Sequence, residues 1–271
     1  MKAKNLWKVL FVAMMSLVLL AACGSNDSED ASGDVEQNAL EKIKESGTMV
    51  FGVKNDTRLF GLKNPSNGDI EGFDIDIAKE IAKGIIGEDA KVELKEVTSK
   101  TRIPLLQNDE IDAIVATMTI TEERKEQVDF SDVYFEAGQS LLVKSGSPIK
   151  SIDDITSDTK VLTVKGSTSA QNIREKTEAQ VLEFENYAEA FTALKAGQGD
   201  TLTTDNSILY GMADEDPTYE VVGGTFTDEP YGIAVKKGGT ELVEEINRVL
   251  AELKENGKYD EIYSKWIKGM N

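Results

Sequence analysis

The stretch IDAIVATMTITEER, residues 111–124, carries the pattern that decides the fold. Its first six residues, 111–116, are mostly apolar and include two isoleucines and a valine, so they predict a short buried strand. Thr121 is a favourable N-cap residue, and the polar segment 122–127 that follows it predicts a helix. A strand, a short polar loop and a helix in this order form the repeating unit of α/β proteins.

The same alternation of strands and helices is predicted on both sides of this stretch. Phe73, Ile77, Ile81 and Ile85 recur every four residues, which is the spacing of an apolar stripe on a helix. Strands that alternate with helices imply parallel sheets with helices on both faces, and therefore the α/β class. The predicted strands are 48–53, 91–97, 111–116, 141–143, 161–164, 181–184, 201–204, 221–222 and 233–235, and the predicted helices include 73–85, 102–107, 170–176, 187–195 and two at the C-terminus.

The alternation restarts in the middle of the chain, which predicts two lobes. Residues 38–143 and 231–271 are expected to form the first lobe, with 144–230 inserted as the second, because the two final helices can return to the first. Strands near Leu142 and Ile233 are expected to join the lobes as hinges. Ligands of α/β sheets bind beyond the carboxyl ends of the strands, so two facing lobes predict a ligand cleft between them.

The N-terminal segment has the features of a lipoprotein signal. Three lysines among the first eight residues precede an apolar run over 9–22, which is shorter than the about 20 residues that a spanning helix needs. Small residues end this run, and Cys23, the only cysteine, follows it directly. These features predict a signal peptide over 1–22, a lipid on Cys23 and a flexible linker over 23–37. An ordinary signal peptide with an incidental cysteine is the alternative.

The composition excludes several classes of function. The 271 residues carry a formal net charge of −19, which argues against nucleic-acid binding because that function needs a basic surface. The chain has no histidine, which excludes Ser–His–Asp and Cys–His nucleophiles and removes the commonest metal ligand. No glycine-rich phosphate loop occurs. No catalytic group, metal or cofactor is therefore expected.

Polar residues with a shared chemical logic follow the predicted strands. Arg124 lies in the first turn of a helix, where a cation opposes the helix dipole, and such a local conflict suggests a function. Arg124, the Thr119 hydroxyl and helix-start amides would bind a carboxylate, and Thr168 would add a donor from the facing lobe. Asp205 would accept an ammonium group. A carboxylate and an ammonium bound side by side describe an α-amino acid.

Each of these residues also has an ordinary structural interpretation. Asp205 alone could be a helix cap, Thr117 a strand residue and Arg124 a member of a surface ion pair. Asp74 and Asp76 lie in the first turn of a predicted helix, where capping and interaction with the helix dipole explain them. The joint position at strand ends is what favours a binding site.

Six stretches of the chain resemble the extracytoplasmic solute-binding proteins of polar amino-acid ABC importers. The longest runs from residue 105 to 143, and its part TMTITEERKEQVDFSDVYF, residues 117–135, is the most specific. The resemblance covers about residues 40–269 and implies the two-lobed periplasmic-binding-protein fold of type II, with two hinge strands and a ligand cleft between the lobes. The other matching stretches are GTMVFGVKND (47–56), GDIEGFDIDIAKEIAK (68–83), VKGSTS (164–169), LKAGQGDTLTTD (194–205) and YGIAV (231–235).

The resemblance also implies roles for residues already singled out. By position, Arg124 and Thr119 would hold the ligand α-carboxylate, and Thr168 would reach it from the second lobe. Thr117 and Asp205 would hold the α-ammonium group. These roles agree with the chemistry inferred from the residues themselves.

Two further cations bear on the ligand side chain. Lys54 and Arg102 lie on cleft loops, would repel a lysine or arginine side chain, and favour a carboxylate or carboxamide. The pattern is most similar to the aspartate/glutamate-binding branch, with glutamine as the close alternative. Tyr187 and Tyr231 are expected to line the side-chain pocket. The alternatives are an exposed loop position for Lys54 and an acid such as Glu96 as the partner of Arg102.

Together these features predict a binding protein rather than an enzyme. It would capture a polar L-amino acid by hinge closure and deliver it to the permease and ATPase of an ABC importer, as a monomer. Its lipid would hold it on the outer face of the cell membrane, in a cell of the Gram-positive type. A lyase or dehydratase on the same fold, and a sensor or adhesin that presents its bound state to a receptor, are the competing hypotheses.

Overall fold

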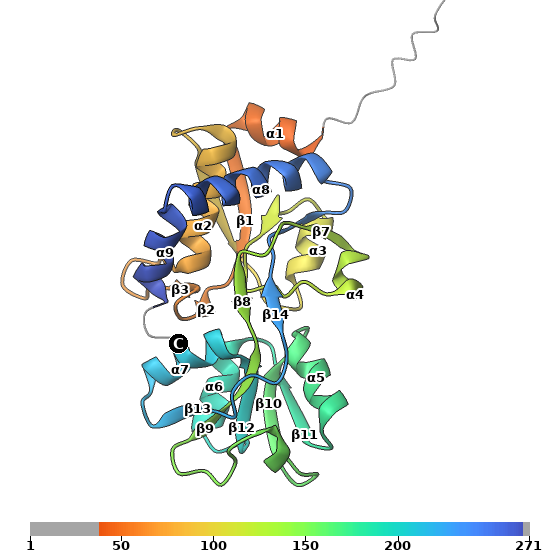
Figure 1. The fold of residues 1–271 in the computed structure, drawn as a ribbon, viewed down its shortest axis with the longest axis vertical. Helices are drawn as coiled ribbons and strands as arrows, with labels where there is room; N and C mark the ends of the chain where they lie inside the picture. Colours follow the sequence, from red (N-terminus) through yellow and green to blue (C-terminus); the bar gives the residue numbers. More distant parts are fainter. Residues whose placement is uncertain (1–37, 268–271) are drawn as a thin grey trace, which may run out of the picture. The chain divides into compact units, whose positions relative to one another are not determined.

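The computed structural model describes residues 38–267, which form two lobes, each built on a five-stranded sheet (Figure 1). The predicted signal peptide over 1–22, the lipid site Cys23 and the linker over 23–37 lie outside the described residues. Among residues 38–267, no helix combines the length and the apolar character that a membrane span requires.

The sheet of the first lobe has the strand order β5-β1-β6-β15-β7. Its centre is β1 (Thr48–Val53), which pairs in parallel with β5 (Lys91–Glu96) and with β6 (Ala113–Ile114). The strand β15 (Ala234–Lys236) is antiparallel to β6 and to β7 (Val128–Phe130). The predicted strand at 48–53 is confirmed residue for residue.

Helices cover both faces of this sheet. On one face, α2 packs against α8 and α9 around a core that includes Phe51, Ile77 and Ile246. On the other face, α3 packs on β1, β6 and β15 around Leu106 and Ile114. The helices of this lobe are α1 (Ala39–Ser46), α2 (Phe73–Ile86), α3 (Arg102–Gln107), α4 (Glu122–Lys125), α8 (Thr240–Glu255) and α9 (Lys258–Trp266).

The sheet of the second lobe has the order β11-β10-β12-β9-β13. Here β10 pairs in parallel with β11 and β12, whereas β9 is antiparallel to both β12 and β13. The strands are β9 (Gln139–Lys144), β10 (Lys160–Val164), β11 (Gln180–Phe184), β12 (Thr201–Asp205) and β13 (Tyr219–Val222). The helical elements are the short η1 (Ile152–Asp154), α5 (Thr168–Lys176), α6 (Tyr187–Lys195) and α7 (Asn206–Glu215).

Two short strands, β8 (Phe135–Ala137) and β14 (Glu229–Tyr231), pair antiparallel and run between the two sheets (Figure 1). The sequence placed these connections near Leu142 and Ile233 instead. Leu142 belongs to β9 in the second sheet, where it pairs with Leu202 of β12. This pairing indicates that the second lobe starts at about residue 138 and not at residue 144. The rest of the assignment of residues to lobes stays a prediction.

The predicted parallel sheets each contain one antiparallel strand, β9 in the second lobe and β15 in the first. β9 follows β8 directly, and β15 follows β14 directly, so each enters its sheet from the other lobe. The parallel strands of each sheet end where the lobes meet. A chain that arrives from that side must run in the opposite direction, which makes β9 and β15 antiparallel to their neighbours.

A small three-stranded sheet shapes the loop after β1. It consists of β2 (Asp56–Thr57), β3 (Gly61–Lys63) and β4 (Ile70–Glu71). Gly61 passes so close to Lys54 that a Cβ atom at Gly61 would collide with the Lys54 carbonyl oxygen. The absence of a side chain at Gly61 therefore lets β3 fix the backbone at Lys54.

Candidate ligand site between the lobes

The candidate site lies where the parallel strands of both sheets end. Lys54 follows β1, and Thr117 lies three residues beyond β6 in the first lobe. Gly166 follows β10, and Asp205 ends β12, in the second lobe. Contacts between these segments, described below, bring the two sets of strand ends together.

Arg124 reaches from the first lobe to the second. Thr121 caps α4 by accepting a hydrogen bond from the Arg124 amide at 3.2 Å, which fixes the start of the helix as predicted. The guanidinium is buried and donates from Nη1 to the Thr119 carbonyl oxygen at 2.7 Å and from Nη2 to the Gly166 carbonyl oxygen at 3.3 Å. The alternative of a surface ion pair is therefore wrong for Arg124.

Thr117 adopts a strained backbone conformation in the middle of the site. Its φ angle is +45°, in the left-handed region that β-branched residues rarely occupy. Its amide donates to Asp74 Oδ2 at 2.9 Å, and Asp74 Oδ1 accepts a hydrogen bond from the Tyr134 hydroxyl at 2.9 Å. Thr117 is thus a turn residue after β6, and not a residue of the strand.

The interpretation of Asp74 as a helix cap is wrong. The N-cap of α2 is Gly72, and both Asp74 carboxylate oxygens are bound by groups outside the helix. Burial raises the pKa of Asp74 to about 7, while the hydrogen bonds from Tyr134 and Thr117 act in the opposite direction. Asp76 accepts hydrogen bonds from Lys265 and Trp266, each at 2.7 Å, so it too contacts residues outside α2.

Arg102 contacts the same turn from the opposite side. Its Nη1 donates to the Ala116 carbonyl oxygen at 2.7 Å and to the Thr117 carbonyl oxygen at 3.4 Å. Its Nε is buried and has no partner among the residues that the structure describes. Glu96, the alternative partner, is bound by Lys63 at 2.7 Å instead. Burial lowers the pKa of Arg102 to about 9.

Lys54 is buried, which contradicts the alternative of an exposed loop lysine. Only 1% of the residue is exposed, and Nζ donates to Ser99 Oγ at 2.9 Å. The ammonium group also lies 5.1 Å from the centre of the Tyr187 ring in the second lobe. Burial lowers the pKa of Lys54 to about 7, although Asp56 beside it acts to raise it. Lys54 and Asp56 therefore bring opposite charges to one end of the site.

Asp205 is held by tyrosine and not by the helix that follows it. It occupies the N-cap position of α7 but makes no side-chain cap bond. Its Oδ2 accepts a hydrogen bond from the Tyr231 hydroxyl at 2.7 Å, and Ser207 Oγ lies 3.0 Å from the same hydroxyl. Burial raises the pKa of Asp205 to about 7, and the nearby Glu229 adds to the rise. The Tyr187 hydroxyl accepts a hydrogen bond from Thr204 at 3.0 Å.

The hydroxyl of Thr168 is hydrogen-bonded to two other side chains of the protein. It donates to Glu229 Oε2 at 2.8 Å and accepts from Gln139 Nε2 at 3.1 Å. Asn172 Nδ2 donates to Glu229 Oε1 at 3.1 Å. Thr168 is the first residue of α5, so its backbone amide lies at the positive end of a helix. The predicted donor in Thr168 is therefore better placed on its amide than on its hydroxyl.

The described residues also include members of the site that the sequence did not reveal. Asp74, Glu229 and Gln139 are almost fully buried, and each is hydrogen-bonded to a predicted site residue. An acidic residue in a first helical turn, such as Asp74, resembles an ordinary cap. Glu229 stands in a three-residue strand beside Pro230, where no periodic pattern marks burial.

Two grooves adjoin the buried cluster. One, of about 710 Å³, is lined by Thr119 and Arg124 of the first lobe, Thr168 of the second and Glu229 of the connecting strand β14, among others. A second pocket, of about 390 Å³, is lined by Asp56 and Tyr187, among others. The lobes are thus in contact around the predicted site residues.

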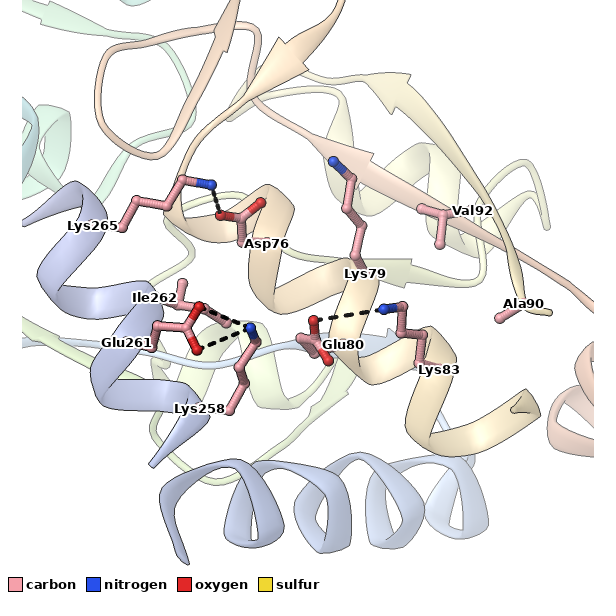
Figure 2. A pocket seen from close by; sticks show the side chains of 10 residues that line it. All are labelled: Asp76, Lys79, Glu80, Lys83, Ala90, Val92, Lys258, Glu261, Ile262 and Lys265. Atoms are coloured by element: carbon pink, nitrogen blue, oxygen red, sulfur yellow. Dashed lines mark hydrogen bonds and ion pairs between the residues drawn. The ribbon is translucent and has the colours of Figure 1, made fainter. Parts of the chain in front are cut away.

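A further pocket lies away from the strand ends, on the first lobe. Figure 2 shows its side chains, which come mainly from α2 and α9 and enclose about 410 Å³. Several of its charges pair with one another, as in the ion pairs of Lys265 with Asp76 and of Lys258 with Glu261. None of the predicted site residues lines it. Within residues 38–267, no cluster of three or more His, Cys, Asp or Glu is arranged to hold a metal ion.

Comparisons with known proteins identify the family of the chain. Residues 49–269 match the family of bacterial extracellular solute-binding proteins, family 3. The ABC transporter glutamine-binding protein GlnH of Bacillus subtilis (strain 168) is 66% identical over 267 residues, which cover 98% of each chain. The glutamine-binding protein of Geobacillus stearothermophilus is 60% identical over 250 residues, covering 88% of this chain and 95% of the relative.

A solved structure has the same architecture. An ancestral arginine-binding protein bound to glutamine superposes with a TM-score of 0.76 and 46% identity, covering 81% of this chain and 97% of its own. The family match spans nearly all of the described residues, and both relatives align over almost their full lengths. The chain belongs to the bacterial extracellular solute-binding proteins of family 3.

Proposed function

We propose that this protein captures a polar L-amino acid, with L-glutamine as the preferred ligand, and delivers it to the permease of an ABC importer. The observation that carries the proposal is the buried pair of opposite charges at the strand ends, Arg124 from the first lobe and Asp205 from the second. An α-amino acid carries a carboxylate and an ammonium group on one carbon. Arg124 and Asp205 supply the matching charges.

The α-carboxylate would bind to Arg124, the Thr119 hydroxyl and the Thr168 amide. Arginine has five N–H donors, and the two hydrogen bonds of Arg124 leave others for a carboxylate. The α-ammonium group would bind to Asp205 and to the backbone or hydroxyl of Thr117. Tyr231 occupies one oxygen of Asp205, which leaves Oδ1 as the acceptor.

The ligand side chain would lie near Lys54, Arg102, Tyr187 and Tyr231. The sequence favours glutamate or aspartate there, because of the two cations. The contacts of these cations support the carboxamide instead: Lys54 is lowered in pKa to about 7 and donates to Ser99, and Arg102 donates to two backbone carbonyls. These bonds leave fewer N–H donors of the two cations free for a side-chain carboxylate, although Arg102 keeps its charge near neutral pH because its pKa is about 9.

A carboxamide also suits the donors and acceptors that remain. The buried Arg102 Nε has no partner among the described residues and would donate to the amide oxygen. Asp56 would accept from the amide nitrogen, since it lies beside Lys54 and is bound by the Tyr187 amide at 2.7 Å. The names of two relatives, both glutamine-binding proteins, support the same choice. Glutamate is the second candidate.

Capture would proceed by closure of the lobes about β8 and β14. Ligand bound to the first lobe would stabilise the closed form, because Asp205 and the Thr168 amide contact it only after closure. The closed form would then dock on the permease. No bond of the ligand has to break, so the protein is not an enzyme in this scheme. Recovery of unaltered glutamine after long incubation would exclude the lyase alternative.

The protein would work outside the cytoplasm as a lipid-anchored monomer. The support comes from the sequence over 1–23 and from the extracellular family to which the chain belongs. A cell with a single membrane, of the Gram-positive type, is the setting in which such an anchor retains a binding protein. Replacing Cys23 with alanine should release the protein into the medium, as a blot of medium and membrane fractions would detect.

Calorimetric titration of ligand-stripped protein tests the central proposal. L-Glutamine, L-glutamate, L-aspartate and L-arginine would be compared on the wild-type chain and on Asp205→Asn. Tight binding of glutamine that weakens strongly in Asp205→Asn supports the proposal. Tight binding of glutamate with weak binding of glutamine would replace the ligand, and binding of none of the four would overturn the assignment to a polar amino acid.

A further inference from the structure

Thr117 must be held in a conformation that its side chain disfavours. At a φ of +45°, the Cβ atom of a residue other than glycine crowds its own backbone, and β-branching worsens the conflict. Such a conformation persists only where neighbouring contacts impose it. The turn at Thr117 leads from β6 to Thr119, whose carbonyl oxygen orients Arg124. The strained residue therefore belongs to the turn that leads to the proposed carboxylate-binding residues Thr119 and Arg124.

Asp74 supplies the contact on the amide side of this residue. Its Oδ2 accepts from the Thr117 amide at 2.9 Å, while its Oδ1 is fixed by the Tyr134 hydroxyl at 2.9 Å. Asp74 and Tyr134 are both almost fully buried. With both oxygens engaged by the protein, Asp74 is directed at the turn and not at a ligand.

Arg102 acts on the carbonyl side of the same segment. Its Nη1 lies 2.7 Å from the Ala116 carbonyl oxygen and 3.4 Å from that of Thr117. Asp74 comes from the first turn of α2 and Arg102 from the first residue of α3, so above the pKa of Asp74, which burial raises to about 7, two helices contact one turn with opposite charges. A charged acceptor makes a stronger hydrogen bond to an amide than a neutral one does.

We infer that Asp74 is a positioning residue, which holds Thr117 in the left-handed conformation that the ligand-binding turn requires. The inference rests on the proposed function for its effect on binding, but not for its effect on the turn. This role explains why Asp74 is buried next to the site although it forms no ion pair among the described residues. A carboxylate that only capped the helix would be exposed. Its contribution to affinity acts through Thr117.

A double-mutant cycle of Asp74→Asn and Thr117→Gly in the full chain, purified in mild detergent, tests this inference. Asparagine keeps the shape of Asp74 but loses its charge, and glycine adopts the required φ without steric conflict. With Thr117 intact, Asp74→Asn should weaken glutamine binding about tenfold, as expected for loss of one charge-assisted hydrogen bond that holds the strained turn in place. In the Thr117→Gly background the same change should cost less than about threefold.

Equal losses in both backgrounds would overturn the inference, because Asp74 would then act independently of Thr117. Urea unfolding of the same four proteins, without ligand, provides a second readout. The midpoint should fall less for Asp74→Asn with Thr117 intact than in the Thr117→Gly background, because a strained Thr117 can relax once Asp74 no longer holds it and so offsets part of the lost hydrogen bond. If the wild-type chain binds no amino acid, the proposed function fails, and the unfolding cycle still decides the positioning role.

Two further variants complete the design. Asp76→Asn is the matched control, because Asp76 lies two residues away on α2 but contacts Lys265 and Trp266. It should leave glutamine affinity unchanged, and a loss equal to that of Asp74→Asn would contradict a specific role. If Asp74→Asn does not fold, Tyr134→Phe removes only the hydroxyl that orients Asp74, and it should weaken binding more with Thr117 intact than in the Thr117→Gly background. Equal losses there would also overturn the inference.

Discussion

The Nη2 atom of Arg124 donates a hydrogen bond to the backbone carbonyl oxygen of Gly166 at a distance of 3.3 Å, so a first-lobe side chain contacts the backbone of the second lobe. The same guanidinium is held in its own lobe by the Thr119 carbonyl oxygen at 2.7 Å. Gly166 permits this approach, since a Cβ atom there would crowd the backbone of Lys100. Arg124 therefore both binds ligand, in our proposal, and contributes to closure.

Arg124→Lys should weaken glutamine binding by about 30-fold or more, since truncating a buried hydrogen-bonded charge costs about 2–5 kcal/mol. Lysine keeps the charge but cannot contact Thr119, Gly166 and a carboxylate together. Calorimetry on the variant measures the loss. Arg248→Lys is the matched control, because Arg248 is an exposed residue of α8 that pairs with Glu245 and Glu252. An equal loss in both variants would contradict the role of Arg124.

Glutamine affinity should fall as the pH is lowered from about 8 to 5. Asp205 has a pKa of about 7 in the ligand-free protein, so it becomes protonated over this range and ceases to attract an ammonium group. The affinity should drop by up to about tenfold per pH unit below the pKa. Titrations at several pH values test this, and Asp205→Asn should bind weakly with a flatter profile. A profile of equal slope in the variant would assign the titration to another group.

The raised pKa of Asp205 also affects the stability of the ligand-free protein. Between about pH 4 and 7 the folded form keeps a proton on Asp205 that the unfolded form has lost, so stability falls as the pH rises through this window. The contribution is about 1–4 kcal/mol, given a shift from 3.8 to about 7. Urea unfolding should show a smaller fall for Asp205→Asn than for wild type. The same fall in both proteins would refute this assignment.

Lys54→Gln should change specificity more than it changes overall affinity. Loss of the cation removes the attraction for a side-chain carboxylate, while a carboxamide can still bind, so the preference for glutamine over glutamate should increase about threefold to tenfold. Paired titrations with the two ligands give the ratio. Lys63→Gln is the control, since Lys63 is an exposed residue of β3 that pairs with Glu96. A decrease of the ratio in Lys54→Gln would show that Lys54 favours the carboxamide directly.

Glu229→Gln should weaken glutamine binding about threefold to tenfold, although Glu229 does not contact the ligand in our proposal. Glu229 accepts from Thr168 and Asn172, so it anchors the N-terminal half of α5 to the connecting strand β14. The side-chain amide that replaces the Glu229 carboxylate would place its N–H donors against the donor of Thr168 or of Asn172. Calorimetry should detect the loss, and Glu220→Gln, a change at a half-buried residue of β13 that pairs with Lys150, should not cause one.

Much of the fold follows from local patterns in the sequence. The bounds of β1 and α6 were predictable to the residue, because the run at 48–53 is mostly apolar and the segment 187–195 has a helical pattern. The direction of β9 and β15 was not predictable. It depends on the side from which the chain enters each sheet, which is a property of the connection between lobes and not of the strands themselves.

The candidate site shows a similar division. Arg124 could be singled out because a cation in the first turn of a helix opposes the helix dipole. Asp205 could be singled out because it stands at the end of a strand, where ligands of α/β sheets bind. Asp74 could not, since its position in a first helical turn has a sufficient local explanation. Its contact with Thr117 joins residues 43 positions apart, and only the folded backbone brings them together.

The pairing of β8 with β14 has a consequence for how this protein can change over evolutionary time. Ala137 and Glu229 are direct partners in one ladder, so both ends of the inserted segment leave the first lobe side by side, about 5 Å apart. One contiguous stretch of the gene thus encodes a module whose two ends lie next to each other in the folded protein. Recombination at these points can exchange half of the binding surface, including Asp205, while the first lobe keeps Arg124 and Thr119, which in our proposal bind the common α-carboxylate group.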